Sequence, residues 1–381
     1  MFTLVLMASA AVVAGPAEPA VKSRQNAVEL VRLLGDPSFK IREKASDDLL
    51  ELGSHALEAL REGIKHSDLE ISDRCSKLLP MALDARVQEQ IAIFLAKADG
   101  PIPKDLPCIN RWVAVAGSGK NSREMYAELI KHHRKALLEL ELHPDKATDQ
   151  YHAFSQGVSN RQRGRAIAER KEIVSYPELV LFLFMGADPN ARKGKESVVS
   201  YSHSSLFLNS TYVPGMLAGV GANEATKSLF IAWLEQERYP TLVRRGYGLA
   251  ATAGLKEVAP IVVRYASDKK LTPSYRAMAL ASSLKLFDKT TIKELEPLLK
   301  DDTLVSKSTV NGTTASTEIR DIALGISIVV TGQKPSDYGY SRYREDAPAG
   351  TATSYTYFAL TDKQREDAIA KWNEHLEKSA K

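Results

Sequence analysis

Cysteine is scarce in this chain, which has only Cys75 and Cys108 among 381 residues. Two thiols cannot build a disulfide framework or an all-cysteine zinc site. A strong charge of either sign is also missing, because 51 Lys and Arg residues nearly balance 47 Asp and Glu residues and leave +4. A charge this small on so long a chain gives no argument for nucleic acid or anionic lipid as a partner. With 44% hydrophobic and 26% charged residues, the composition excludes a collagen, a disordered tail and a polytopic membrane protein.

Motifs that carry chemistry are missing as well. No histidine pair has the His-Glu-x-x-His spacing of a zinc hydrolase, and no Gly-x-Ser-x-Gly elbow is present. The run 117–120, Gly-Ser-Gly-Lys, imitates a phosphate-binding loop, but Ala114 stands where the loop needs its first glycine and Asn121 where it needs Ser or Thr. We therefore predict no catalytic residue, no metal site and no cofactor, and we expect that the protein is not an enzyme.

The amino terminus has the pattern of an export signal. Residues 3–15 form an uncharged apolar run, and Gly15 and Ala17 are the small residues expected before a cleavage site at Glu18. Residues 1–17 are thus predicted to be a signal peptide, although the usual positive charge is absent from their start. The mature protein would be periplasmic or extracellular, with no stable membrane span. A buried first helix is the alternative.

One short pattern recurs along the chain. A β-branched or aromatic residue, usually followed by Arg, precedes a small residue by four positions, and apolar residues follow. Copies begin at Ile41, Ile71, Val243, Tyr275 and Ile319. In all but the Val243 copy the fourth residue further on is small, at Ala45, Cys75, Ala279 and Ala323. Each copy is predicted to be an amphipathic helix whose small residue lets a neighbouring helix approach closely. Helix pairs of this size must stack to complete a core, so the fold predicted is an all-α solenoid.

Helix starts are marked by capping residues. Asp36-Pro37 and Thr272-Pro273 have the pattern of an N-cap followed by a first-turn proline. Two capping boxes are predicted, Ser67 with Glu70 and Thr361 with Gln364.

Several segments carry a family resemblance. The stretch 33–45, with its Asp-Pro turn and hydrophobic-Arg step, resembles a HEAT repeat of the armadillo type. Ordered segments further along the chain, at 111–126, 310–324, 331–339 and 365–372, resemble secreted planctomycete-type HEAT-repeat proteins of unassigned function. The resemblance implies a HEAT-like α-solenoid of stacked helical hairpins outside the cytoplasm. It implies no catalytic residue.

The chain is predicted to have several segments. The proline-rich run 100–107 separates the first repeats from a helical middle section, and Asn311-Gly312 is a strong hairpin signal. The predicted segments are N-terminal HEAT repeats at 24–98, the helical middle section at 108–175, C-terminal HEAT-like repeats at 176–333 with a β-hairpin at 303–320, a linker rich in Tyr, Gly and Pro at 335–360, and a C-terminal helix at 361–378.

Two groups of residues are candidates for binding a partner. The first is the basic stretch, which comprises Arg161, Arg163, Arg165, Arg170 and Lys171; its alternative is a solvated helix start. The second is the tyrosine segment, of which Tyr338, Tyr340 and Tyr343 are the candidates, because Tyr is favoured at recognition surfaces. The alternative is that these rings hold the linker to the helices.

The function predicted is an exported, non-enzymatic scaffold for protein partners of unknown identity. Exposed arginines of the repeats, including Arg244, Arg245 and Arg276, would then tune its surface charge. The alternative is that these arginines brace neighbouring repeats. One alternative is a cell-envelope structural protein with no discrete ligand. Another is an enzyme with a site between the middle section and the C-terminal repeats, where Asp149, Tyr151 and His152 form the nearest polar cluster.

Overall fold

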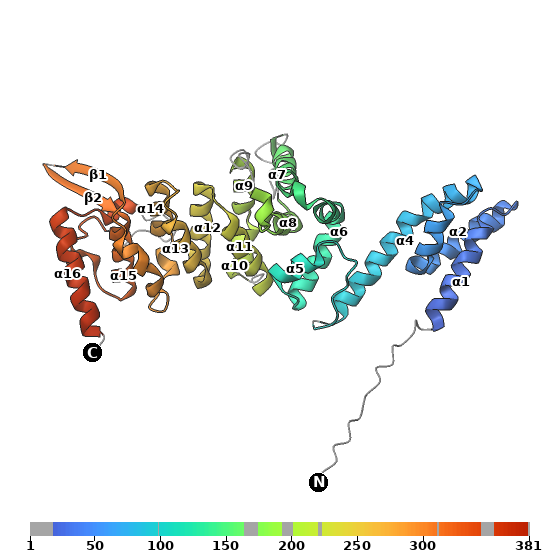
Figure 1. Cartoon of the computed structure of the whole chain (residues 1–381), viewed down its shortest axis with the longest axis horizontal. Helices are drawn as coiled ribbons and strands as arrows, with labels where there is room; N and C mark the ends of the chain where they lie inside the picture. Colours follow the sequence, from blue (N-terminus) through green and yellow to red (C-terminus); the bar gives the residue numbers. More distant parts are fainter. Residues whose placement is uncertain are drawn as a thin grey trace, which may run out of the picture. The chain divides into compact units, whose positions relative to one another are not determined.

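Figure 1 shows a computed structural model of the chain, which is mostly helical and includes one small β-hairpin. The structure describes residues 18–97, 99–163, 174–192, 201–219, 223–310, 312–343 and 354–379. The expectation of a helical chain with a single hairpin excursion is confirmed at this level. The predicted signal peptide at 1–17 and the part of the predicted linker at 344–353 lie outside the described residues. Within those residues, no helix combines the length and apolar character needed to cross a membrane.

The described residues form sixteen α-helices and two strands. The α-helices are α1 (Glu18–Leu33), α2 (Phe39–Leu52), α3 (Leu57–Gly63), α4 (Leu69–Ala96), α5 (Ile109–Ala116), α6 (Lys120–Leu142), α7 (Ala147–Arg163), α8 (Tyr176–Gly186), α9 (Tyr201–Leu208), α10 (Tyr212–Ala218), α11 (Glu224–Gln236), α12 (Pro240–Ala253), α13 (Ala259–Ser267), α14 (Pro273–Ser282), α15 (Ile319–Val330) and α16 (Asp362–Ser379). The strands are β1 (Leu304–Val310) and β2 (Thr313–Glu318), and short 3-10 helices include η8 (Ile292–Lys300), η9 (Pro335–Tyr338) and η10 (Tyr355–Phe358).

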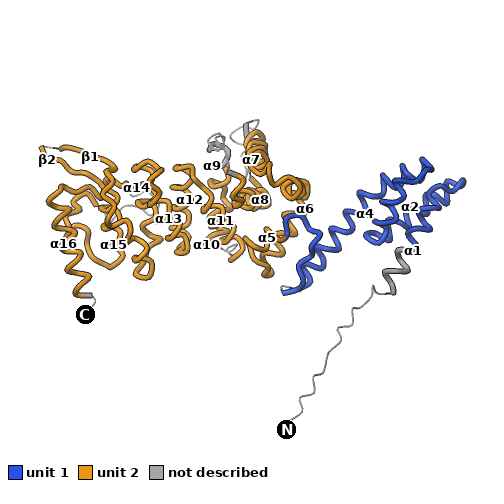
Figure 2. Tube along the Cα trace, viewed as in Figure 1, with its two compact units in different colours: residues 1–109 blue, residues 110–381 orange. Residues whose placement is uncertain are grey.

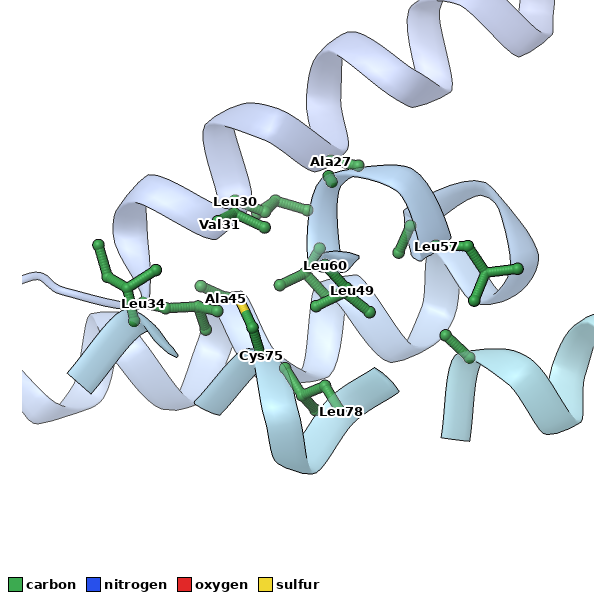
Figure 3. Packing of buried hydrophobic residues seen from close by; sticks show 14 residues of the cluster. Ala27, Leu30, Val31, Leu34, Ala45, Leu49, Leu57, Leu60, Cys75 and Leu78 are labelled. Carbon is green, nitrogen blue, oxygen red and sulfur yellow. The ribbon is translucent and has the colours of Figure 1, made fainter. Parts of the chain in front are cut away.

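The chain divides into two compact units, unit 1 (Met1–Ile109) and unit 2 (Asn110–Lys381), which Figure 2 shows in different colours. In unit 1, α1 packs on α2 and α3 packs on α4, while α1 also contacts α3 and α2 contacts α4. Apolar residues three and four positions apart on each helix turn toward a shared interior. Figure 3 shows this core, which includes Ala27, Leu30, Val31 and Leu34 of α1, Ala45 and Leu49 of α2, Leu57 and Leu60 of α3, and Cys75 and Leu78 of α4.

Both cysteines are unbridged and buried. Burial raises the pKa of the Cys75 thiol to about 11, so this side chain is a neutral thiol at ordinary pH. A Cβ added to Gly63 would lie 2.4 Å from Cys75 Sγ, which shows how closely α3 approaches α4. Cys75 therefore fills the position of a small core residue, as its place in the repeated pattern predicts.

Helix starts in unit 1 differ by one or two residues from the predicted ones. The N-cap of α2 is Ser38, and the carboxylate of Asp36 accepts the main-chain N–H of Ser38 at 2.7 Å, so Asp36 is not the cap. The N-cap of α4 is Asp68, which accepts the main-chain N–H of Glu70 at 2.8 Å, so Ser67 is not the cap either. In both turns a carboxylate takes the main-chain donors.

Aromatic side chains dominate the first half of unit 2. The Trp112 ring of α5 lies 5.6 Å from that of Tyr126 in α6 and 5.4 Å from that of Phe184 in α8. Phe182 of α8 stacks on Phe207 of α9 with centroids 4.1 Å apart. The continuous apolar run of α8 is thus explained, because this helix is buried on all sides by its neighbours.

The second half of unit 2 contains the later copies of the repeated pattern. Their small residues, Ala279 in α14 and Ala323 in α15, are both buried, and α14 contacts α12, α13 and α15. The predicted cap Thr272 is the N-cap of α14, with Pro273 as the first helical residue. Gly254 ends α12 in the left-handed conformation (φ 69°), which a residue without Cβ adopts at no steric cost.

The predicted hairpin is present. β1 and β2 pair antiparallel, with Val310 opposite Thr313 across a two-residue turn. On its other side β2 is joined to residue 360, because Ser316 and Leu360 exchange main-chain hydrogen bonds of 2.8 and 2.9 Å. Helix α16 follows directly.

Candidate partner-binding surfaces

Arg161 is the only side chain of the basic stretch that the structure describes. It lies half-exposed near the end of α7 and forms an ion pair with Glu178 of α8. Glu178 also closes the capping box of α8 with Ser175, so its carboxylate is held in place. The main chain of Arg163 belongs to α7, but its side chain is not described, and Arg165, Arg170 and Lys171 lie outside the described residues. Of the basic stretch, the structure thus places one side chain, that of Arg161, beside the carboxylate of Glu178.

His133 lies near this ion pair. Its main chain departs from helical geometry inside α6 (φ −134°, ψ 25°), which kinks the helix there. The ring meets Phe154 edge to face at 5.9 Å, and Nε2 has no hydrogen-bond partner among the described residues. Partial burial lowers the pKa of His133; Glu178 opposes that shift, whereas His132 and Arg161 add to it. The unpartnered Nε2 atom is itself buried, so it does not face a binding partner.

The other histidines near α6 face single carboxylates. His132 Nε2 lies 3.4 Å from Glu128, and His143 Nε2 lies 3.9 Å from Glu139, each one helical turn away. Among the residues the structure describes, no three His, Cys, Asp or Glu side chains come together as a metal-binding group.

Two of the three candidates of the tyrosine segment, Tyr338 and Tyr340, lie inside unit 2, and Tyr343 is partly exposed. Tyr338 is buried and donates its hydroxyl to Gln333. Tyr340 is 1% exposed, and its hydroxyl donates to the main-chain oxygen of Asp321 at 2.8 Å. Tyr343 packs at 5.7 Å from Phe358. The buried Tyr338 and Tyr340 rings hold this segment against α15 and are not open to a partner, which matches the alternative that these rings fasten the linker.

A buried ion pair lies beside Tyr340. Arg365 of α16 donates from Nε and Nη2 to the two carboxylate oxygens of Asp321 in α15, at 2.8 and 3.0 Å. Arg365 also donates to the hydroxyl of Ser316 in β2 at 2.8 Å. Sequence reasoning did not single out Arg365, although it lies three residues before Ala368 and seven before Trp372, on the apolar face of α16. That spacing was the available signal of its burial.

Arg276 is a second buried arginine, and its predicted exposure is wrong. Only 1% of the residue is exposed. Its guanidinium donates to the main-chain oxygen of Ala266 at the end of α13 and forms an ion pair with Asp301. By contrast, Arg244 and Arg245 on α12 are exposed as expected. The arginine of this copy therefore braces neighbouring elements instead of tuning the surface.

In the polar cluster considered for an enzyme, Asp149 and Tyr151 do not face one another. Tyr151 is buried, accepts a hydrogen bond from Trp233 at 3.2 Å and stacks on Phe182 at 5.2 Å, whereas Asp149 is exposed. Residues two apart on a helix point in different directions, so Asp149 and Tyr151 diverge.

Comparisons with known proteins found no match among protein-family models, curated proteins or solved structures.

Proposed function

We propose that the chain is an exported, non-enzymatic α-solenoid of HEAT-like helical hairpins that serves as a scaffold for protein–protein interaction. The observation that carries the proposal is the burial of the small residue in four copies of the repeated pattern, at Ala45, Cys75, Ala279 and Ala323. A repeated small residue at helix contacts is what side-by-side stacking of helical hairpins requires.

The contacts of unit 1 support this stacking. The first helices of successive hairpins, α1 and α3, contact each other, and so do the second helices, α2 and α4. Charged side chains bridge α2 and α4, because Arg42 lies 3.2 Å from Glu70 and Arg74 lies 2.8 Å from Glu43. Such exposed pairs contribute little stability singly, but they fix the register of neighbouring helices.

The end of unit 2 supports it too. A solenoid needs a terminal element that covers the apolar face of its last repeat. Here η10 and α16 cover α15, with Phe358, Ala368 and Trp372 buried. Figure 1 shows α16 beside α15 at the carboxyl-terminal end of the chain.

A binding role is favoured because the buried arginine–carboxylate pairs of unit 2 serve its internal packing. Asp321 with Arg365 and Asp301 with Arg276 are consumed in fastening elements together. The side chains that remain for a ligand are on the surface, such as Arg161, Arg244 and Arg245. Surface charge of this kind steers association with a partner.

Affinity capture of the mature chain from its own envelope fraction, at low and at high salt, tests this function. Arg161→Glu is compared with Arg264→Glu, since both arginines are exposed and pair with a glutamate on a neighbouring helix. If the partner is lost at high salt and with Arg161→Glu, but is retained with Arg264→Glu, it binds at the basic stretch.

Other results of the same experiment separate the alternatives. A partner that persists at high salt points to apolar surface instead. Failure of in-envelope crosslinking to recover any partner would favour the structural envelope protein, and turnover in a broad hydrolase screen would favour the enzyme. Export itself is tested by the intact mass of the chain, which should correspond to a start at Glu18.

A further inference from the structure

Strand β1 has an outer edge that its partner strand does not use. Paired residues in an antiparallel ladder alternate between hydrogen-bonded and non-hydrogen-bonded positions. Val310 and Thr313 flank a two-residue turn and form a hydrogen-bonded pair, so the next pair toward the strand ends, Thr309 with Thr314, is non-hydrogen-bonded. The same alternation makes Lys307 with Ser316 non-hydrogen-bonded.

The Ser316–Leu360 bridge establishes this phase independently. Ser316 directs its main-chain N–H and C=O away from β1 to Leu360. Its opposite residue, Lys307, must then direct its own N–H and C=O away from β2, and Thr309 does the same two residues on. We call these four main-chain groups of Lys307 and Thr309 the β1 edge. None of them has a main-chain hydrogen bond to another described residue, and both side chains are exposed.

Two cationic side chains lie at β1 itself. Lys307 is the only charged residue of β1, and the guanidinium of Arg342 donates to Ser308 in the same strand at 3.1 Å. Within the described part of the chain, neither cation forms an ion pair with a carboxylate. The one carboxylate of the hairpin, Glu318, is held by Arg320 at 2.6 Å.

We propose that the β1 edge binds an extended, acidic peptide segment of a partner protein, which adds to the hairpin as a third strand. Main-chain groups at a sheet edge give affinity for an extended chain, and side chains beside them give specificity. A carboxylate opposite Lys307 satisfies its charge, whereas a second copy of β1 would bring like charges together. This inference rests on the proposed scaffold function and names the chemistry of its partner.

Fluorescence anisotropy with the full chain tests the proposal. The probe is a labelled peptide of about six residues that alternates valine and threonine around a central glutamate. Thr309→Pro removes an outward N–H from the β1 edge without removing a hydrogen bond to β2, and we expect it to weaken binding about tenfold or more. Thr314→Pro is the matched control, because it makes the same change on the opposite edge of the hairpin and should leave affinity unchanged.

A charge reversal keeps the test valid if a proline variant fails to fold. Lys307→Glu should weaken binding of the glutamate peptide and strengthen binding of a peptide with lysine at that position. Equal effects of Thr309→Pro and Thr314→Pro, equal binding of both peptides to the unchanged chain, or concentration-dependent dimerisation through β1 would overturn the proposal. So would slow hydrogen exchange of the Thr309 amide in the free chain, since the edge would already be occupied.

Envelope capture distinguishes this failure from failure of the scaffold function. If the Thr309→Pro and Lys307→Glu variants still capture the partner, the proposal that the β1 edge binds it is wrong, whereas the proposed scaffold function is unaffected. If the unchanged chain captures no partner, the proposed scaffold function is wrong. The peptide titration then decides by itself whether the β1 edge binds an acidic strand.

Discussion

At the scale of single residues, a glycine in the carboxyl-terminal part of unit 2 allows a close approach of an aromatic ring. A Cβ added to Gly325 in α15 would lie 2.4 Å from the ring of Phe358 in η10. Glycine in a helix interior ordinarily costs stability, so its presence here is explained by the approach of this ring. The ring in turn lies against Tyr340, at 6.1 Å.

Gly325→Ala should therefore destabilise the protein. We expect a loss of about 1–3 kcal/mol, because the added methyl group forces the Phe358 ring or the helix to move. Gly248→Ala is the matched control: this glycine is also inside a helix, α12, but an added Cβ would meet nothing within 4 Å. That variant should gain about 0.5–1 kcal/mol. Chemical denaturation measures both, and equal effects would show that Phe358 does not fill the space.

The second prediction concerns His133 and the pH dependence of stability. Burial lowers the pKa of His133 from its ordinary value of 6.5, so the folded protein binds this proton less readily than the unfolded chain. The contribution of the neutral ring to stability is complete above pH 6.5 and is lost as the pH falls through the lowered pKa. Denaturation midpoints measured across this window should fall more steeply for the wild-type protein than for His133→Asn.

The adjacent histidine is the control for this experiment. His132 is exposed and only adds to the lowered pKa of His133, so His132→Asn should reduce the pH dependence less than His133→Asn does. If the two asparagine variants gave parallel profiles, the titration of His133 would not contribute to stability.

At the scale of elements, one buried arginine links helix α16 to α15. Arg365 enters the interior from α16 and pairs with Asp321 on α15 through two hydrogen bonds. Removing one partner of a buried ion pair leaves the other charge without compensation. We therefore expect Arg365→Met to cost about 3–5 kcal/mol and to raise hydrogen exchange in α16.

An exposed pair between two other helices provides the comparison. Arg264 of α13 lies 3.3 Å from Glu235 of α11, with both side chains largely in solvent. Arg264→Met should change stability by less than about 1 kcal/mol. A loss of the same small size for Arg365→Met would mean that packing of Trp372 and Ala368, and not the ion pair, holds α16.

Elements were predictable where the pattern was local. The hairpin at Asn311-Gly312 and the helix behind Thr361 depend on neighbouring residues, and both are present; the main-chain N–H of Gln364 donates to the Thr361 hydroxyl at 3.3 Å. The start of α2 lies two residues beyond the expected cap, because Asp36 accepts the main-chain N–H of Ser38 and Ser38 becomes the N-cap. The start of α4 lies one residue beyond the expected cap Ser67, because Asp68 accepts the main-chain N–H of Glu70 instead.

Long-range pairings were not predictable in the same way. Arg276 occupies the position of an exposed repeat arginine, but its carboxylate partner, Asp301, lies 25 residues further along the chain. Tyr340 likewise lies 19 residues from the oxygen that its hydroxyl contacts. The local sequence around such residues does not indicate their distant hydrogen-bond partners. Because these side chains are polar, they were expected to be exposed, whereas the fold buries them.

At the scale of the whole molecule, the chain has two compact units, so we expect a substitution in the interior of one unit to destabilise that unit and not the other. Gly63→Val in unit 1 would place a side chain 2.4 Å from Cys75 Sγ and 3.0 Å from Val31. Gly325→Val in unit 2 would do the same to Phe358. Both changes overpack a closed interior, so each should destabilise its own unit.

Hydrogen exchange by mass spectrometry distinguishes the two effects in one chain. Gly63→Val should raise exchange about tenfold in peptides from α1 to α4 and leave peptides from α12 to α16 at wild-type rates. Gly325→Val should produce the reverse pattern. Acceleration of both units by either substitution would mean that the chain unfolds as one cooperative body, because opening of one core would then expose the other.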